Sequence, residues 1–280
     1  MSIVIGTLCL NEMEWLPKLY EQHKDWPGLI KWVFVEAADA MYAQANPEMV
    51  SPQGLSVDGT TEYLEELEAV DSRVIHVKYG ITSHPNPAQG KCAARQAYLD
   101  VANSLGPELV LTLDADEFYC QDTQRDLMST ILPAVKDGFT IRYRNIWHPP
   151  VLVNDPLFSY EAVGKFWGVL VCKLWKWSPG MSYRGNHNSP TVRSRTLNRN
   201  LKRLDATDPH LQFIHMGFAS SMATRTAKNR YYVERGEGRT DHRGSYVKSR
   251  AAFEHWSPGM PLPNGDKIVD YTGPIPECFR

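Results

Sequence analysis

Along the first 145 residues, short apolar runs alternate with polar stretches whose apolar residues recur at helical spacing. Uninterrupted apolar runs of this length are typical of strands that are buried on both faces of a parallel sheet. Four runs are predicted as strands: Ile3–Leu10, Ile30–Glu36, Arg73–Tyr79 and Leu109–Leu113. Four helices are predicted between and after them: one capped by Asn11, one opened by Asp58, Gln89–Leu105 and Asp122–Val135. This order predicts an α/β fold with a mostly parallel, Rossmann-like sheet flanked by helices.

Two polar loops interrupt the alternation. Residues 37–57 separate the second predicted strand from its helix, and residues 79–88 follow the third predicted strand. Long loops in a compact domain are usually functional. Both follow the carboxyl ends of strands, where open α/β sheets bind their ligands. We therefore expect a ligand site at this edge of the sheet.

The second half of the chain is richer in aromatic residues and turns. Two strands and two helices are predicted there: Phe139–Trp147, Lys165–Trp177, Thr224–Arg235 and Ser245–His255. The proline-rich tail from Ser257 is predicted to be extended. We expect residues 1–145 and 146–280 to be two portions packed into the same domain, the second an extension of the first.

Composition excludes several classes of function. The chain has 280 residues, with 30 Lys and Arg against 32 Asp and Glu and a formal net charge of −2. This balance argues against a general nucleic-acid binder. No stretch approaches the ~20 apolar residues of a membrane span, and the N-terminus lacks the basic start of a signal peptide. The five scattered cysteines include no CxxC pair, which favours free thiols in a reducing compartment, here the cytoplasm.

The segment Leu109–Phe118 carries the strongest chemical signal. Its apolar strand delivers Asp114 and Asp116 to the carboxyl end of the predicted sheet. Residues two apart point the same way in an extended chain, so the two carboxylates can share one site. Such oxygen ligands suit Mg²⁺ or Mn²⁺ that also holds substrate phosphates. The alternative is an acidic turn that closes the strand and caps the next helix.

Other polar residues are predicted at the same edge. The stretch Thr7–Glu12 follows the first strand, and Glu36 ends the second. Lys91 and Arg95 lie four apart, on one face of a predicted helix. The sequence contains neither a G-x-G-x-x-G loop nor a Walker A loop. A divalent cation is therefore expected to take the place of such a loop in neutralising a diphosphate.

These motifs resemble those of the GT-A-fold glycosyltransferases, in particular the large inverting family 2. The resemblance covers residues 2–120 and, more faintly, residues 165–235. The segments that match the family's motifs are Cys9–Glu12 after the first strand, Glu36 at the end of the second, Asp58–Glu62 at a helix start, Lys91 with Arg95, and Asp114-Ala115-Asp116.

The resemblance implies a nucleotide-sugar site. It implies that Asp116 binds a metal ion and that Asp114 touches the ribose or a metal-bound water. Glu36 or Asp39 is implied in recognition of the base. The remaining donor-site residues implied by the resemblance are Leu8, Asn11, Glu12, Lys91, Arg95 and Ala115.

Two histidines in the second half extend the resemblance. His187 lies in a stretch that the family uses at the acceptor or diphosphate site. His215 is implied as a further metal ligand beside Asp114 and Asp116, the alternative being a core histidine at a strand end. No motif identifies the catalytic base, and Asp155 and Glu161 are expected only from their position along the chain.

The resemblance implies an enzyme that transfers a sugar from a nucleotide sugar to an acceptor hydroxyl, with inversion. The expected donor is UDP-glucose or UDP-galactose, and the expected cofactor is Mn²⁺ or Mg²⁺. The acceptor is a glycan, a lipid-linked sugar, a protein or a small molecule. One alternative is a catalytically degenerate module that binds nucleotide sugars or carbohydrates. The other is a sugar nucleotidyltransferase, which would normally carry a glycine-rich loop after the first strand.

Overall fold

The structure is a computed structural model, and it describes ten ranges of the chain. They are residues 1–84, 87–131, 138–148, 156–163, 170–184, 191–194, 199–200, 203–205, 211–234 and 267–280. The predicted helix Ser245–His255 lies outside these ranges. None of the helices in them is long and apolar enough to cross a membrane.

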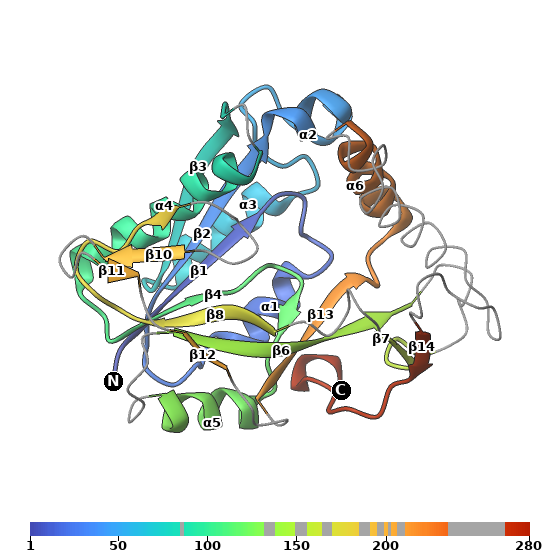
Figure 1. Ribbon diagram of the computed structural model, residues 1–280. Helices are drawn as coiled ribbons and strands as arrows, with labels where there is room; N and C mark the ends of the chain where they lie inside the picture. Colours follow the sequence, from blue (N-terminus) through green and yellow to red (C-terminus); the bar gives the residue numbers. More distant parts are fainter. Residues whose placement is uncertain are drawn as a thin grey trace.

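The N-terminal half forms the parallel part of one large sheet (Figure 1). Its four strands run in the spatial order β3-β2-β1-β4. Neighbouring strands in this group pair in parallel throughout. They are β1 (Ile3–Cys9), β2 (Leu29–Asp39), β3 (Val74–Thr82) and β4 (Leu109–Thr112). The predicted α/β class and its parallel strands are confirmed for this half.

Beyond β4 the strands that continue the main order of the sheet pair antiparallel, so the predicted parallel pairing does not extend to them. Strand β8 (Leu170–Lys176) pairs antiparallel with β4, and β6 (Gly138–Trp147) pairs antiparallel with β8. Strands β7 (Tyr160–Val163) and β14 (Lys267–Asp270) continue outward in the same way. Parallel neighbours need a long crossover, usually helical, whereas no described residue between β6 and β8 is helical.

Strand β13 (Gln212–Phe218) joins the two halves at the carboxyl edge. It pairs in parallel with β6 and antiparallel with the short β5 (Glu117–Phe118). The pairing sets His215 opposite Glu117 on one side and opposite Asn145 on the other. Strand β12 (Arg203–Asp205) also pairs with β6, while β9 (Tyr183–Arg184), β10 (Thr191–Ser194) and β11 (Arg199–Asn200) form a separate small sheet.

Alternating residues of the strands point into two hydrophobic cores, one on each face of the sheet. Ile3 and Ile5 of β1 face the core that holds α1 (Leu16–His23), α3 (Thr60–Val70) and α5 (Gln121–Ile131). Val4 faces the core under α4 (Pro87–Leu105). Tyr98 of α4 lies directly on Gly6, where any Cβ would overlap its ring. A glycine at this position therefore lets α4 approach the sheet.

Local chemistry changes two predicted boundaries. Asn11 does not cap α1: it has a φ of +55°, and its side chain binds the backbone of Met49 and Val57 instead. The predicted loop 37–57 is only partly a loop. Strand β2 extends to Asp39, whose carboxylate caps α2 (Ala40–Ala45), and a 3₁₀ helix follows at Pro47–Met49.

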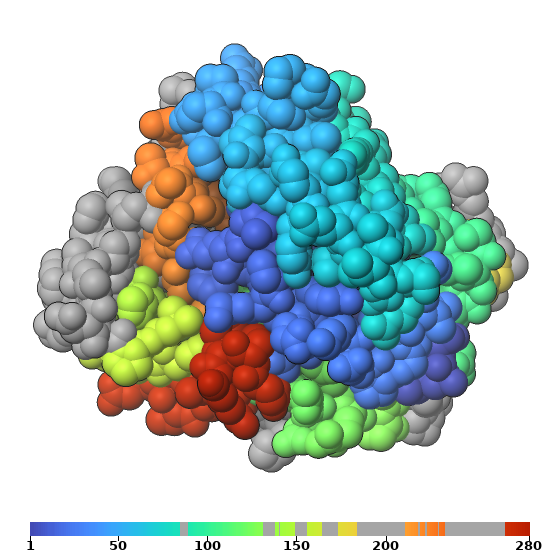
Figure 2. Space-filling model, turned by 180° about the vertical axis from the view of Figure 1, so that it is seen from behind, coloured from blue at the N-terminus to red at the C-terminus, as the bar shows by residue number. Residues whose placement is uncertain are grey.

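The C-terminal segment returns to the N-terminal half. In Figure 2 residues 267–280 (red) lie against the first helix region (blue) and against α5 (green). Glu277 accepts a hydrogen bond from Gln22 of α1, and Phe279 packs against Trp15 and Phe118. The described end of the predicted extended tail thus contains β14 and a 3₁₀ helix at Glu277–Phe279. Helix α6 (Met222–Glu234), predicted at 224–235, packs on α2.

Candidate functional site

The turn after β4 places the Asp-x-Asp pair at the carboxyl edge of the parallel strands. Asp114 and Asp116 flank Ala115, whose side chain is buried in the core. The backbone of the turn is fixed on both sides: the Glu117 N–H donates to the Asp114 carbonyl, and the Met216 N–H of β13 donates to the Asp116 carbonyl. The apolar strand thus ends in an acidic turn at this edge of the sheet.

Both oxygens of Asp114 contact cations. Arg95 lies 2.6 Å from Oδ1, and Lys173 of β8 lies 2.8 Å from Oδ2. Burial alone would raise the pKa of Asp114, but the charges of Arg95 and Lys173, with a further contribution from Lys91, hold it well below its usual range. Asp114 therefore stays ionised, and in this arrangement its oxygens face protein cations rather than a shared site with Asp116.

Glu117 belongs to the same cluster, although the sequence interpretation left it out. Its Oε1 lies 2.8 Å from Lys173, and its Oε2 accepts the Asp114 N–H. Burial raises the pKa of Glu117 to about 7, with Lys173 opposing the shift and Asp114 adding to it. The signal for Glu117 was its place in the acidic run, whereas nothing in the sequence of β8 marks Lys173.

Asp116 faces His215 across the β5–β13 pairing. The His215 Nε2 lies 3.4 Å from Asp116 Oδ2, and its Nδ1 lies 2.6 Å from Asn145 Oδ1. A carbonyl oxygen only accepts, so Nδ1 carries the proton and Nε2 presents a lone pair toward Asp116. Burial lowers the pKa of His215 and thereby favours this neutral form. A Cβ on Gly217 would lie 2.5 Å from the ring, so the glycine leaves room for it.

Two more side chains border Asp116. Lys228 of α6 approaches its Oδ2 to 3.9 Å. Burial raises the pKa of Glu12 to about 8, with Lys228 opposing the shift and Asp116 adding to it. Glu12 is thus largely protonated at neutral pH and contributes little negative charge. Lys228 was not predicted, because α6 reaches this edge only through tertiary packing.

The two acidic residues predicted for base recognition differ in their surroundings. Glu36 is fully buried, and its carboxylate accepts from the Ser56 N–H at 2.6 Å and from the Thr61 hydroxyl at 2.7 Å, with His76 at 2.9 Å. Burial opposes these bonds, yet they lower the pKa of Glu36 to about 2. Glu36 therefore anchors the segment that opens α3, and no face of its carboxylate is left for a ligand.

Asp39 keeps one oxygen without a partner. Its Oδ1 caps α2, but Oδ2 is buried and makes no hydrogen bond. The hydroxyl of Thr82, which is opposite Asp39 in the β2–β3 register, is also buried and unpaired. Both atoms border Gly90, where a Cβ would lie 2.7 Å from the Thr82 hydroxyl and 3.6 Å from Asp39 Oδ2. Buried polar groups without partners are rare, which makes this corner a place for a polar ligand.

The remaining predicted donor-site residues have mixed surroundings. Lys91 and Arg95 share a face of α4: Arg95 contacts Asp114, while Lys91 lies over the ring of Tyr231 of α6 at 5.9 Å. The Asn11 side chain is used to hold the 49–57 segment. Leu8 is partly buried against the core under α4.

The predicted catalytic base Glu161 is placed elsewhere. It forms an ion pair with Arg144, with Nε at 2.7 Å from Oε2. In the β6–β7 register Glu161 is opposite Ile146, whereas Asn145 and His215 alternate to the other face of the sheet. Glu161 is therefore wrong as a base for a reaction at Asp116. Asp155 and His187 lie outside the described residues.

The predicted metal triad is not assembled in the described ranges. No group of three or more His, Cys, Asp or Glu there is arranged to hold a metal ion. Asp116 and the Nε2 of His215 remain as two neighbouring ligand atoms of the kind that Mn²⁺ and Mg²⁺ sites can use. Such sites are commonly completed by substrate phosphates and water.

Comparisons with known proteins give a weak likeness in fold. No protein-family model matches the chain, and no curated protein matches it in sequence. The crystal structure of S. aureus TarS 1–349 has 12% identity and a TM-score of 0.46, over 91% of this chain and 70% of that one. A second crystal structure of S. aureus TarS has 12% identity and a TM-score of 0.44, over 91% of this chain and 43% of that one. The structure of TarS 1–349 in complex with UDP-GlcNAc has 11% identity and a TM-score of 0.41, over 90% of this chain and 72% of that one. At this similarity we draw no functional conclusion from these structures.

Proposed function

We propose that this protein is a glycosyltransferase that moves a sugar from a UDP-sugar to an acceptor hydroxyl. The proposal rests on one observation above all. The carboxyl edge of the parallel strands gathers a cation-rich cluster around Asp114 and Asp116, and the same edge carries the unpaired polar corner at Asp39 and Thr82. An anion-binding centre and a separate polar corner suit the diphosphate and the base of a nucleotide.

The charge balance of the cluster favours a diphosphate. Four cations, Lys91, Arg95, Lys173 and Lys228, surround Asp114 or Asp116. The two other carboxyl groups there have a pKa of about 8 for Glu12 and about 7 for Glu117, so each is at least partly protonated near neutral pH. An approaching anion therefore meets a net excess of positive charge.

The corner at Asp39 suits a uracil base. Its Oδ2 can accept the imide N–H of the ring, and the Thr82 hydroxyl can donate to a neighbouring carbonyl. Both atoms then gain the partners that they lack in the free protein. This choice between Glu36 and Asp39 follows from the saturated carboxylate of Glu36.

Asp116 and His215 are the proposed holders of a divalent cation. A bound Mn²⁺ or Mg²⁺ would neutralise charge on the departing nucleoside diphosphate. The chain's own residues orient this pair: Asn145 fixes the His215 tautomer, and Met216 fixes the Asp116 backbone. Arg95 and Lys173 hold Asp114 ionised and in place, where we propose that it binds the ribose.

The proposed transfer also requires a base and an acceptor. An inverting transfer needs a group that takes the proton from the attacking hydroxyl. We keep Asp155 as the proposed base on its position in the chain. The proposed donor is UDP-glucose or UDP-galactose, and the acceptor is a glycan, a lipid-linked sugar, a protein or a small molecule.

One observation favours a second candidate function. Both oxygens of Asp114 are occupied by protein cations, and the described residues bring together only two of the three proposed metal ligands. Such a site suits a module that binds a nucleotide sugar without cleaving it. The two candidates differ in whether nucleoside diphosphate is released.

Binding is tested by thermal unfolding with UDP, GDP, CMP and dTDP, each with and without Mn²⁺. A ligand at ~100 times its dissociation constant stabilises the fold by about 2.7 kcal/mol, which a melting curve detects. We expect UDP with Mn²⁺ to give the largest shift. Equal shifts with all four nucleotides, or none, would contradict the proposed base and metal sites. Asp116→Asn is the matched variant, since it keeps the shape of the side chain but removes its charge.

A further inference from the structure

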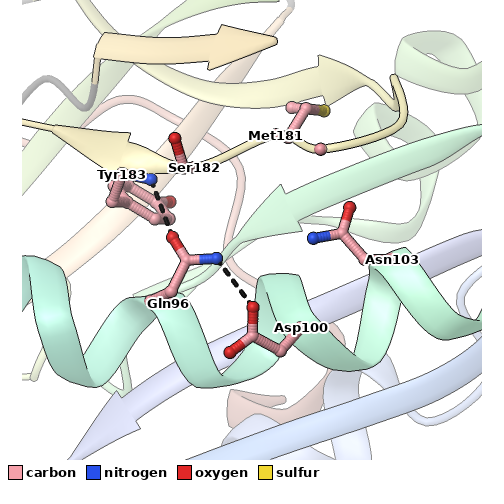
Figure 3. A pocket seen from close by; sticks show the side chains of 7 residues that line it. Gln96, Asp100, Asn103, Met181, Ser182 and Tyr183 are labelled. Atoms are coloured by element: carbon pink, nitrogen blue, oxygen red, sulfur yellow. Dashed lines mark hydrogen bonds between the residues drawn. The ribbon is translucent and has the colours of Figure 1, made fainter. Parts of the chain in front are cut away.

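A cavity lies on the far flank of α4, away from the Asp-x-Asp turn. Its volume is about 360 Å³, within the range of small-molecule sites. Gln96, Asp100 and Asn103 line it from the helix, and residues 180–183 line it from the opposite side (Figure 3). Arg95 points to Asp114 from the same helix, whereas Gln96 turns its side chain toward Tyr183. The two sites thus use different faces of α4.

The wall of the cavity is fixed by hydrogen bonds. Gln96 accepts from the Tyr183 N–H at 3.0 Å and donates to Asp100 at 2.9 Å (Figure 3). The Tyr183 hydroxyl is locked in a buried triad with Tyr98 and Thr112, with oxygen separations of 2.6 to 3.2 Å. A ligand that enters therefore meets a preformed wall, which lowers the cost of binding.

The lining has unused hydrogen-bonding capacity. The side-chain oxygen of Asn103 is buried and has no partner. Asp100 is exposed, and one of its carboxylate oxygens accepts a hydrogen bond from Gln96. None of the seven lining residues is Lys, Arg or His, so the lining offers no cation to a phosphate or carboxylate. Side-chain amides and a carboxylate suit a ligand whose hydroxyl groups both donate and accept.

We propose that this cavity is a second saccharide-binding site, which takes one neutral sugar unit at a distance from the transfer centre. Sugar hydroxyls would donate to Asn103 Oδ1 and to the Asp100 carboxylate. That the sugar belongs to a glycan acceptor rests on the proposed function. The binding itself does not.

The test uses the 280-residue chain and NMR of its side-chain amides. Methyl glycosides of glucose, galactose and N-acetylglucosamine are titrated in turn, with inorganic phosphate as the charged probe. We expect at least one glycoside to shift the Gln96 and Asn103 side-chain resonances saturably, and phosphate to leave them in place. Asn103→Leu, which removes the acceptor and fills the space, should weaken binding about tenfold or more. Asp100→Ala should act in the same direction.

The control is Gln121→Leu, which changes an exposed amide at the start of α5. It should leave the glycoside affinity unchanged. The proposal would be overturned if no glycoside gave a saturable shift. It would also be overturned if Asn103→Leu and Asp100→Ala both bound the glycoside with wild-type affinity. UDP binding is measured on the same samples. If the protein binds a glycoside but not UDP, the result counts against the proposed function alone. If it binds UDP but no glycoside, the result counts against this site alone.

Discussion

At the scale of single residues, the site depends on groups that hold the ring of His215. Asn145 sets which ring nitrogen carries the proton, and Gly217 leaves room for the ring. Neither residue offers a ligand atom to the nucleotide in our proposal. Both nevertheless determine where Nε2 points, and the binding of a ligand at Asp116 would depend on that direction.

We predict that Gly217→Ala displaces His215. The new Cβ would lie 2.5 Å from Cε1 and 2.9 Å from Nε2, so the ring must move. We expect a loss of about 1–3 kcal/mol in the free energy of unfolding, measured by urea denaturation. In the background of His215→Ala the same substitution should cost much less. Equal costs in both backgrounds would contradict the contact.

A second prediction concerns the corner at Asp39. Asp39→Asn replaces the unpaired acceptor Oδ2 by a group that can donate, while Oδ1 or its equivalent can still cap α2. We expect UDP affinity to fall about tenfold or more, because a donor would face the imide N–H. Calorimetric titration of UDP measures this. Glu36→Gln is the comparison variant. It should lower the free energy of unfolding, while the molecules that remain folded should keep most of their affinity for UDP.

At the scale of elements, strand β8 completes the turn that follows β4. Lys173 inserts between Asp114 and Glu117, 2.8 Å from each, and is itself buried. Removing one partner of such a cluster leaves an uncompensated buried charge. The antiparallel pairing of β8 with β4 is therefore tied to the chemistry of the acidic turn.

We predict that Lys173→Met lowers the free energy of unfolding by about 3 kcal/mol. Adding Glu117→Gln should restore part of this loss, because it removes a buried carboxyl group that has lost its cation. Lys176→Met on the same strand is the control and should cost less than about 1 kcal/mol. If the double variant were as unstable as the sum of both single variants, the coupling of Lys173 to Glu117 would be refuted.

Helix α1 gives a prediction of pH dependence. His23 is fully buried, with its Nδ1 2.9 Å from the Leu19 carbonyl and its Nε2 accepting the Tyr119 N–H at 3.0 Å. Burial lowers its pKa from 6.5 to about 4, against the raising effects of the Leu19 hydrogen bond and Glu277. Between these values the unfolded chain binds the proton and the folded chain does not. His23 thus stabilises the fold fully above pH 6.5, and this stabilisation is lost as the pH falls toward 4.

Between pH 6.5 and 4 the free energy of unfolding should fall by about 3 kcal/mol. Urea denaturation at several pH values measures it. His23→Gln should be less stable at pH 7 but should show a flatter dependence between pH 6.5 and 4. An unchanged slope in the variant would show that other groups cause the acid sensitivity.

At the scale of the whole molecule, sequence patterns predict the N-terminal half better than the C-terminal half. The apolar runs of β1, β2 and β4 are largely buried on both faces, and such strands can be recognised from the sequence without knowledge of their neighbours. The edge strand β3 is partly exposed. The antiparallel order β8-β6-β7 depends on pairing partners that are far apart in sequence, which local periodicity does not encode.

The residues of the candidate site show the same difference between local and long-range signals. Asp114, Asp116, Lys91 and Arg95 were predictable because they end a strand or share a helix face. Lys173, Asn145 and Lys228 were not, because each reaches the edge on an element placed by long-range packing. Glu36 and Glu161 were misjudged for a related reason: only the structure shows that hydrogen bonds and an ion pair occupy their carboxylates.

In the proposed function, the edge carrying Asp114 and Asp116 cleaves a nucleotide sugar. The most direct measurement is the release of UDP from UDP-glucose and UDP-galactose with Mn²⁺, by the wild-type protein and by Asp116→Asn. We predict slow release by the wild type, acceleration by a suitable acceptor, and loss of release in a variant that keeps the wild-type melting temperature. UDP binding without any release, or release that is equal in the two proteins, would contradict the transferase and favour the binding module.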